Sequence, residues 1–219
     1  MIVTVIIIII NTSDARTATP LEKTVAAHSF TTYSTIYCIW FLAIPQSHDH
    51  TTDDEEQRQK FLPKLATGEM MGCFGLTEPD HGSNPSGMIT NFKSDGDDVI
   101  LNGSKMWISN SPFADIAVVW AKDENKRIHG IIVERGMEGF TTPETHNKWS
   151  LRASATGELI FDNVRVPKKN ILPGKSGLGA PLMCLDSARY GISWGAIGVA
   201  MDCYNTALNY SLERVQFGK

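Results

Sequence analysis

The sequence predicts an α+β protein in which a central β domain, a barrel or a sandwich, is flanked by helical segments. Two observations support this fold class. Short runs rich in β-branched and aromatic residues recur between residues 71 and 175, and such spacing is typical of closed or two-layered sheets. A long helical pattern then covers about residues 182–215.

Five segments of the β domain are expected to be strands, and the first two are expected to pair as a hairpin. Asn102-Gly103 lies between those two, and this dipeptide favours a two-residue turn because both residues tolerate positive φ. The expected strands cover residues 98–101, 105–109, 116–121, 128–134 and 158–166.

A short charged helix is expected immediately before the β domain. Asp54, with Gln57 three residues later, is typical of a capping box at a helix start. Pro63 is expected to break or restart this helix because proline lacks the backbone N–H. Gly68 is expected to end it, since glycine takes the left-handed C-terminal conformation at little cost.

The long helical segment has an apolar face but no partner helix in the sequence. Gly191, Gly195 and Gly198 interrupt it, which indicates close approach by another helix or a ligand. We therefore expect the helical domains of the fold to be incomplete. The apolar face contains Leu185, Ile192, Met201, Leu208 and Leu212.

Composition argues against several kinds of partner. The 219 residues carry a formal charge of −4, so no attraction for nucleic acid is expected. The apolar runs 1–10 and 36–44 are shorter than the roughly 20 residues that span a membrane. The four cysteines show no C-x-x-C spacing, and His48 and His50 lie in a polar linker. No membrane contact and no metal site are therefore predicted.

The chain is expected to divide into four parts. Residues 1–53 combine an isoleucine tract with a threonine-rich stretch and carry no recognisable motif. Residues 54–70 are expected to end one helical domain, residues 71–175 to form the β domain, and residues 176–219 to begin a second helical domain.

Residues 73–83, Cys-Phe-Gly-Leu-Thr-Glu-Pro-Asp-His-Gly-Ser, carry the strongest functional signal. Backbone amides and hydroxyls gathered at a turn suit polar ring edges or phosphates. The segment resembles the flavin-binding signature of acyl-CoA dehydrogenases. Segments 105–110, 151–157 and 213–218 resemble further motifs of that family in the same order, and residues 151–157 and 188–195 are most similar to glutaryl-CoA dehydrogenase.

The resemblance covers about residues 54–219 and implies an FAD site in the β domain. Trp107 would pack on the isoalloxazine ring, since a flat apolar indole suits the face of the ring. Leu76 and Thr77 would face its pyrimidine edge, where a hydroxyl can serve the ring nitrogens. Arg214 would reach the flavin pyrophosphate of a neighbouring subunit. The implied cofactor-binding residues are Phe74, Gly75, Leu76, Thr77, Glu78, Gly82, Ser83, Trp107, Ile108, Ser109 and Arg214.

The same resemblance implies a channel for an acyl-CoA thioester. Ser83 would meet the thioester arm, and the start of the long helix would line the acyl chain and pantetheine. Asn84 stands where the family usually has aspartate, and Ser109 where it usually has threonine. The implied substrate-binding residues are Ser83, Leu182, Leu185, Asp186 and Arg189.

No catalytic base is expected within the sequence, although removal of the α-proton of the thioester requires one. In most of the family, the base is a glutamate beyond the position of Lys219. A minority place it on the long helix, at the position that Ala188 holds here. The chain as given is therefore expected to be inactive.

The resemblance implies FAD-dependent dehydrogenation of an acyl-CoA, with glutaryl-CoA and its decarboxylation to an enoyl-CoA as the expected reaction. An acyl-CoA oxidase of the same fold, and a catalytically dead chain that only binds ligand or subunits, stay open as alternatives. The implied partner is electron-transfer flavoprotein. A complete family member would be a tetramer in the mitochondrial matrix.

Overall fold

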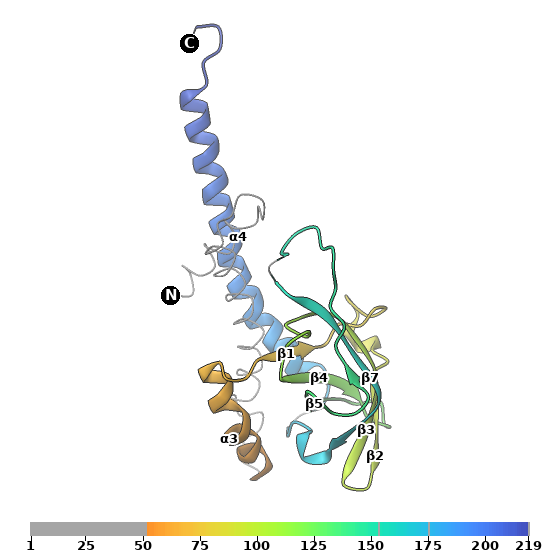
Figure 1. Ribbon diagram of the computed structural model, residues 1–219. Coiled ribbons are helices and arrows are strands. Elements are labelled where there is room, and N and C mark those ends of the chain that lie inside the picture. The colour runs from red at the N-terminus through yellow and green to blue at the C-terminus, as the bar shows by residue number, and fades with distance from the viewer. Residues whose placement is uncertain (1–51, 153, 175, 219) are drawn as a thin grey trace.

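The computed structural model describes residues 52–152, 154–174 and 176–218. Seven strands form one sheet, and one helix precedes and another follows the strands in the sequence. Figure 1 shows that the sheet is curled. Residues 1–51, including the isoleucine tract, His48 and His50, lie outside the described residues. The elements are α3 (Thr52–Thr67), β1 (Gly72–Gly75), β2 (Asn91–Asp95), β3 (Asp98–Ser109), β4 (Ile116–Lys122), β5 (Ile128–Glu134), β6 (Phe140–Thr141), β7 (Thr156–Pro167) and α4 (Gly179–Glu213).

Strand β4 organises the sheet. One of its edges pairs antiparallel with β5, and the other pairs parallel with β1 along residues 72–75 and with β2 at Asn91. The order continues from β2 through β3 and β7 to β6, in antiparallel pairs. Residues 116–121 of β4 are all buried, as expected for a strand covered on both faces.

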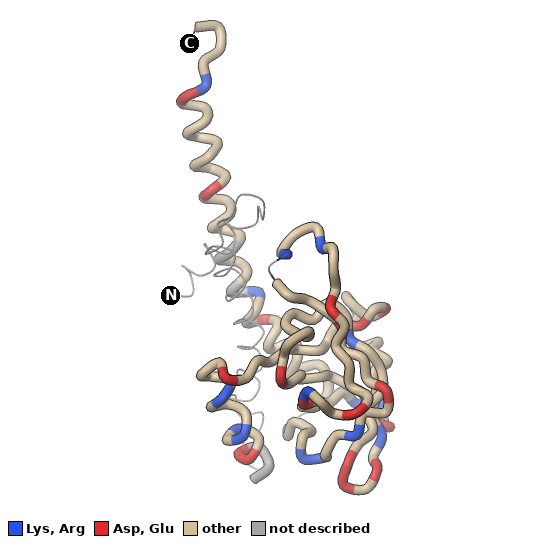
Figure 2. Tube along the Cα trace, in the orientation of Figure 1, with Lys and Arg blue, Asp and Glu red and all other residues tan. Residues whose placement is uncertain are grey.

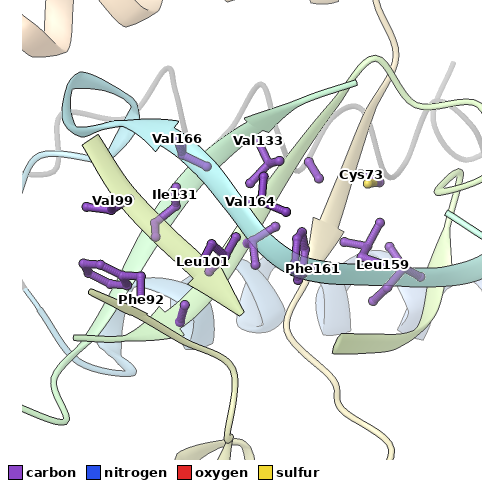
Figure 3. Close-up of a cluster of buried hydrophobic side chains, with 14 of the residues drawn as sticks. Cys73, Phe92, Val99, Leu101, Ile131, Val133, Leu159, Phe161, Val164 and Val166 are labelled. Atoms are coloured by element: carbon purple, nitrogen blue, oxygen red, sulfur yellow. The ribbon is translucent and has the colours of Figure 1, made fainter. Parts of the chain in front are cut away.

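The concave side of the curled sheet encloses the first hydrophobic core. Alternate residues of each strand face inward because successive side chains point to opposite faces. Figure 3 shows these side chains gathered in one cluster inside the curl of the sheet. Among the core residues are Phe92, Val99, Leu101, Val119, Ile131, Val133, Leu159, Phe161, Val164 and Val166.

A second core lies on the other face of β4 and β5, where both helices contact the sheet. Ile116, Val118 and Trp120 alternate with the inward residues of β4 and pack against the helices. From α3 come Phe61 and Leu65, and from the first turns of α4 comes Cys184. This second core fixes the start of α4 against the β domain.

Beyond its first turns, α4 extends away from the β domain, as Figure 1 shows. Many of its apolar side chains are exposed, and Figure 2 shows few charged residues along its outer length. No helix among the described residues is both long enough and apolar enough to cross a membrane. The exposed apolar residues of α4 include Ile192, Ile197, Met201, Tyr204, Leu208 and Leu212.

The expected hairpin at Asn102-Gly103 is wrong. Strand β3 runs unbroken through this dipeptide, and its pairing with β7 shifts register between Leu101 and Gly103. The turn between β2 and β3 lies earlier, at Gly96-Asp97. Gly103 has a φ of 134°, and a Cβ there would lie 2.6 Å from the Cα of Thr90. The glycine therefore serves a β-bulge and a close backbone approach.

Two expectations for the first helix are also wrong. Helix α3 begins at Thr52 and continues through Pro63, because Phe61 and Leu65 on either side of the proline are both buried in the second core. The Gln57 amide does not cap the helix, since it donates to the carbonyl oxygens of Lys169 and Ile171. Gly68 does end the helix, with a φ of 79°.

The expected fold class and the expected later strands are confirmed in outline. Strand β5 has the expected ends, and β4 and β7 each extend a little beyond the expected segments. The α+β class with a central curled sheet is present. Strands β1, β2 and β6 were not foreseen, because they contain five residues or fewer and two of them include glycine, asparagine or aspartate.

Candidate functional site

A cleft of about 400 Å³ lies where the ends of β1 and β3 meet the first turns of α4. Three segments that are distant in the sequence form its walls, and most of the predicted flavin and substrate residues are brought together there. Pro85 is the one lining residue that the sequence did not single out. The lining residues are Phe74, Leu76, Thr77, Gly82, Ser83, Pro85, Trp107, Ile108, Ser109, Leu182, Leu185 and Arg189.

Trp107 projects its indole into the solvent at the edge of the cleft. It has a φ of +61°, which is uncommon for a bulky residue. The register between β3 and β7 shifts between Lys105 and Ile108, so a bulge absorbs this residue. Although Trp107 lies in a strand, its side chain is 57% exposed. Such an outlier points to a functional role for the exposed ring.

The loop after β1 forms the second wall and is fixed against β3. The backbone N–H of Met106 donates to the carbonyl oxygen of Thr77 at 2.9 Å. Thr77 and Ser109 therefore bring two hydroxyl groups to the same cleft as the Trp107 ring. A flat apolar surface beside hydroxyl groups suits a ligand that has an aromatic ring with polar edges.

Helix α4 closes the third side with Leu182, Leu185 and Arg189. Arg189 donates to the carboxylate of Asp186, one turn earlier on the helix, and Asp186 itself does not line the cleft. Both side chains are exposed. Arg189 is the only charged side chain among the lining residues, so the cleft is suited to an anionic ligand.

Two predicted cofactor residues lie behind the wall of the cleft. Gly75 is buried, and a Cβ there would lie 2.8 Å from the Leu159 side chain. Glu78 is 2% exposed, and its carboxylate accepts hydrogen bonds from Lys105 and from two backbone amides. Neither Gly75 nor Glu78 lines the cleft, and both lie behind its wall.

Arg214 lies far from the cleft. It follows the end of α4, where its guanidinium lies 6.0 Å from the ring centroid of Tyr210. Since a helix rises about 1.5 Å per residue, 25 residues separate Arg214 from Arg189 by roughly 38 Å. Arg214 therefore takes no part in this cleft within one copy of the chain.

A second cleft, of about 480 Å³, lies beside Trp107 and Ser109 and was not foreseen. Its other wall is the loop before β7, which contains His146 and the 99% exposed Trp149. The Lys148 ammonium fixes this loop by donating to the carbonyl oxygens of Leu151 and Ser154 and to Thr156 Oγ1. Family resemblance singled out residues 151–157, which include the end of this loop, but no regular apolar periodicity marks residues 145–150.

The exposed indole, the neighbouring hydroxyls and the closing helix form a cleft that is suited to a flat, partly polar ligand. Residues 73–164 match the family model of the acyl-CoA dehydrogenase middle domain. Over these residues, the chain is similar to the middle domain of acyl-CoA dehydrogenases. No group of three or more potential metal ligands occurs among the residues that the structure describes.

Known relatives and solved structures support the same family. The short-chain specific acyl-CoA dehydrogenase of Clostridium acetobutylicum is 40% identical over 178 residues, which are 78% of this chain and 46% of the relative. The crystal structure of a glutaryl-CoA dehydrogenase from Mycobacterium smegmatis in complex with FADH2 is 43% identical, with a TM-score of 0.76. That alignment covers 89% of this chain and 51% of the other.

A third similarity is to a chain in the structure of the electron transferring flavoprotein of Acidaminococcus fermentans. It is 36% identical with a TM-score of 0.75, over 89% of this chain and 51% of the other. The chain thus spans about half the length of the relatives it matches. Curated relatives include mitochondrial and bacterial proteins.

Proposed function

We propose that the cleft holds the isoalloxazine ring of FAD, with Trp107 against one face of the ring and Thr77 and Ser109 at its edge. The observation that carries this proposal is the left-handed backbone of Trp107, which keeps a large apolar ring in water beside two hydroxyl groups. The known M. smegmatis relative in complex with FADH2 supports the choice of cofactor. When bound, FAD would supply the acceptor for a hydride.

We infer that an acyl-CoA thioester enters the same cleft from the side of α4. Leu182 and Leu185 offer apolar surface for an acyl chain or pantetheine, Ser83 offers a hydroxyl, and Arg189 offers a cation for the anionic part of the ligand. Glutaryl-CoA, with decarboxylation to an enoyl-CoA, is the proposed substrate, on the similarity of residues 151–157 and 188–195. Competition with short-chain acyl-CoA esters tests this choice.

The proposed reaction is dehydrogenation of the acyl-CoA by a protein that passes electrons to an electron-transfer flavoprotein. Homotetramers and a mitochondrial matrix location stay predictions that rest on family resemblance. If reduced flavin on the protein were reoxidised by oxygen faster than by electron-transfer flavoprotein, the acyl-CoA oxidase alternative would replace this proposal.

The described residues of the cleft do not include a base for this reaction. No aspartate or glutamate lines the cleft, Asp186 is paired with Arg189, and Glu78 is buried behind the wall. A positioned general base typically contributes about 10²–10⁴ in rate. We therefore expect the 219-residue chain loaded with FAD to show no turnover-rate bleaching of the flavin when it is mixed anaerobically with glutaryl-CoA.

Ala188 offers a way to sharpen that expectation. It follows Leu185, which lines the cleft, by three residues on α4, and residues three apart are neighbours on a helix surface. Ala188→Glu is expected to gain flavin bleaching, whereas Ala200→Glu, on the outer and exposed length of α4, is expected to gain none. Fast bleaching by the unchanged chain would contradict the assignment of the base.

The FAD site is tested by fluorescence titration of FAD into the protein and two tryptophan variants. Stacking of a flat ring on an aromatic side chain is worth about 1–3 kcal/mol, so Trp107→Ala should weaken FAD binding by roughly 5- to 150-fold. Trp149→Ala is the matched control, because it removes an equally large exposed ring from the second cleft alone. A loss of affinity in Trp149→Ala but not in Trp107→Ala would place the ring in the second cleft and overturn the proposal.

A further inference from the structure

We propose that Lys105 and Glu78 are positioning residues that hold the two walls of the flavin cleft together from behind. The inference rests on the proposed FAD site for its consequence in binding. Its structural part concerns only the described residues and can be tested without any flavin.

Lys105 connects β3 to the loop that carries Leu76 and Thr77. Its Nζ lies 2.8 Å from Glu78 Oε1 and 3.2 Å from the carbonyl oxygen of Leu76, and both charged side chains are buried, at 0% and 2% exposure. Lys105 precedes Trp107 by two residues on the same strand. The ion pair therefore lies directly behind the ring that forms one wall of the cleft.

Glu78 extends the connection to the segment that follows the 82–87 loop. Its carboxylate accepts from the backbone N–H of Ile89 at 2.7 Å and of Thr90 at 3.0 Å. The hydroxyl of Thr90 in turn donates to the carbonyl oxygen of Ser104 on β3. The loop at residues 76–78, the segment at residues 89–90 and strand β3 thus meet at one buried charged pair.

This pair is better suited to fixing geometry than to adding stability. Burying two charges removes them from water, and the cost of desolvation often cancels their mutual attraction. A buried pair of this kind can be replaced by neutral residues with little loss of stability when both partners change together. The pair nevertheless gives the cleft walls one defined register, which a flat ligand held between them requires.

The electrostatics of the pair predict a response to pH. Burial lowers the pKa of Lys105 to about 8, against the opposing effect of Glu78, and nearby Lys122 lowers it further. Burial alone would raise the pKa of the Glu78 carboxyl, but hydrogen bonds from Lys105, Thr90 and Ile89 outweigh it and lower that pKa. As the pH rises above about 8, Lys105 loses its charge and the charge-assisted contacts to Leu76 and Glu78 weaken.

Binding and stability are expected to change in opposite directions with this titration. FAD affinity should fall as pH rises through about 8, because the cleft walls lose their connection. The contribution of Lys105 to the free energy of unfolding should rise between pH 8 and 10.5, because the unfolded chain, with the ordinary pKa of 10.5, then binds more protons. If the pair only stabilised the fold, FAD affinity and the free energy of unfolding would not change in opposite directions.

The test compares Lys105→Met, Glu78→Gln and the double variant with the unchanged protein. Each single change leaves a buried group without its partner and should destabilise the fold. The double change should restore most of the stability, since the amide oxygen of the introduced glutamine can still accept from Ile89 and Thr90. FAD should nevertheless bind the double variant roughly tenfold or more weakly, as is typical when a residue that orients the binding groups is removed. The pH dependence of FAD affinity near the pKa of Lys105 should also disappear.

Hydrogen exchange without flavin separates this inference from the proposed function. In the double variant, the Met106 amide, which donates to the Thr77 oxygen, should exchange faster, while the Val133 amide in β5 should be unchanged. Lys93→Met, an exposed lysine on β2, is the matched control. An unchanged Met106 amide, or wild-type FAD affinity in the double variant, would overturn the positioning role. If the unchanged protein bound no FAD, the proposed function would fail, and the exchange result would still decide the role of the pair.

Discussion

The β domain and helix α4 differ in where they place their apolar residues. In the β domain, Val99, Leu101 and Val164 are fully buried against one another. On the outer length of α4, Met201, Tyr204 and Leu212 are 60%, 66% and 77% exposed. The β domain therefore encloses its own core, whereas α4 contributes to a core only through its first turns.

The proposed binding cleft depends mainly on the region that encloses its own core. Two walls of the cleft, at residues 74–85 and 107–109, belong to the β domain, and its third wall belongs to the part of α4 that is packed against the sheet. The exposed length of α4 takes no part in the cleft. Changes in the β domain should therefore alter both stability and binding, and changes on outer α4 should alter neither in the isolated chain.

Truncation of matched leucines should give the largest contrast between the two regions. Leu101→Ala removes a fully buried side chain and should lower the free energy of unfolding by about 2–5 kcal/mol. Leu212→Ala removes an exposed side chain and should change it by no more than about 0.5 kcal/mol. Chemical denaturation measures both. A loss of several kcal/mol in Leu212→Ala would show that another surface covers outer α4 in solution.

Glycine substitutions should give the next largest effect, within the β domain itself. Gly103→Ala meets both a φ of 134° and the backbone of Thr90 at 2.6 Å, and should cost about 1–3 kcal/mol or more. Gly96→Ala is the control, because its φ is also positive but no atom lies within 4 Å of an added Cβ. It should cost about 1 kcal/mol. Equal thermal shifts for the two variants would argue against the close approach at the bulge.

The contact between α3 and the β domain should show the smallest effect of the three. Gln57→Ala leaves the carbonyl oxygens of Lys169 and Ile171 without their donor, and should cost about 1–2 kcal/mol. Gln59→Ala removes only an exposed bond to Glu55 on the same helix and should cost about 0.5 kcal/mol or less. If urea midpoints show no difference between the two variants, Gln57 does not anchor α3.

Local sequence patterns located the strands that are long and apolar. Residues 128–134 of β5 are a largely apolar run with a single histidine, and both ends were predicted correctly. Asn102-Gly103 was misassigned because the same dipeptide can form either a turn or a bulge, and only the approach of Thr90 distinguishes the two. Pro63 was misassigned because the burial of Phe61 and Leu65 outweighs the cost of a missing hydrogen bond.

The site was predictable from motifs more than from periodicity. Family resemblance placed Thr77, Trp107 and Leu185 in one site, although no local rule links these positions. The sequence indicates only weakly that Lys105 is buried beside Glu78. Lys105 follows Val99, Leu101 and Gly103 at alternate positions, so it falls on the buried face of β3. The orientation of Trp107 could not be predicted, because it depends on a bulge that the pairing with β7 creates.

The central claim is that the first cleft, between Trp107 and the loop after β1, holds the flavin ring. A crystal structure of the protein with FAD tests it most directly. We expect electron density for the isoalloxazine ring against the Trp107 indole, with its polar edge at Thr77 and Ser109. Density for the ring against Trp149 in the second cleft, or on a surface away from both clefts, would rule out the first cleft as the flavin site.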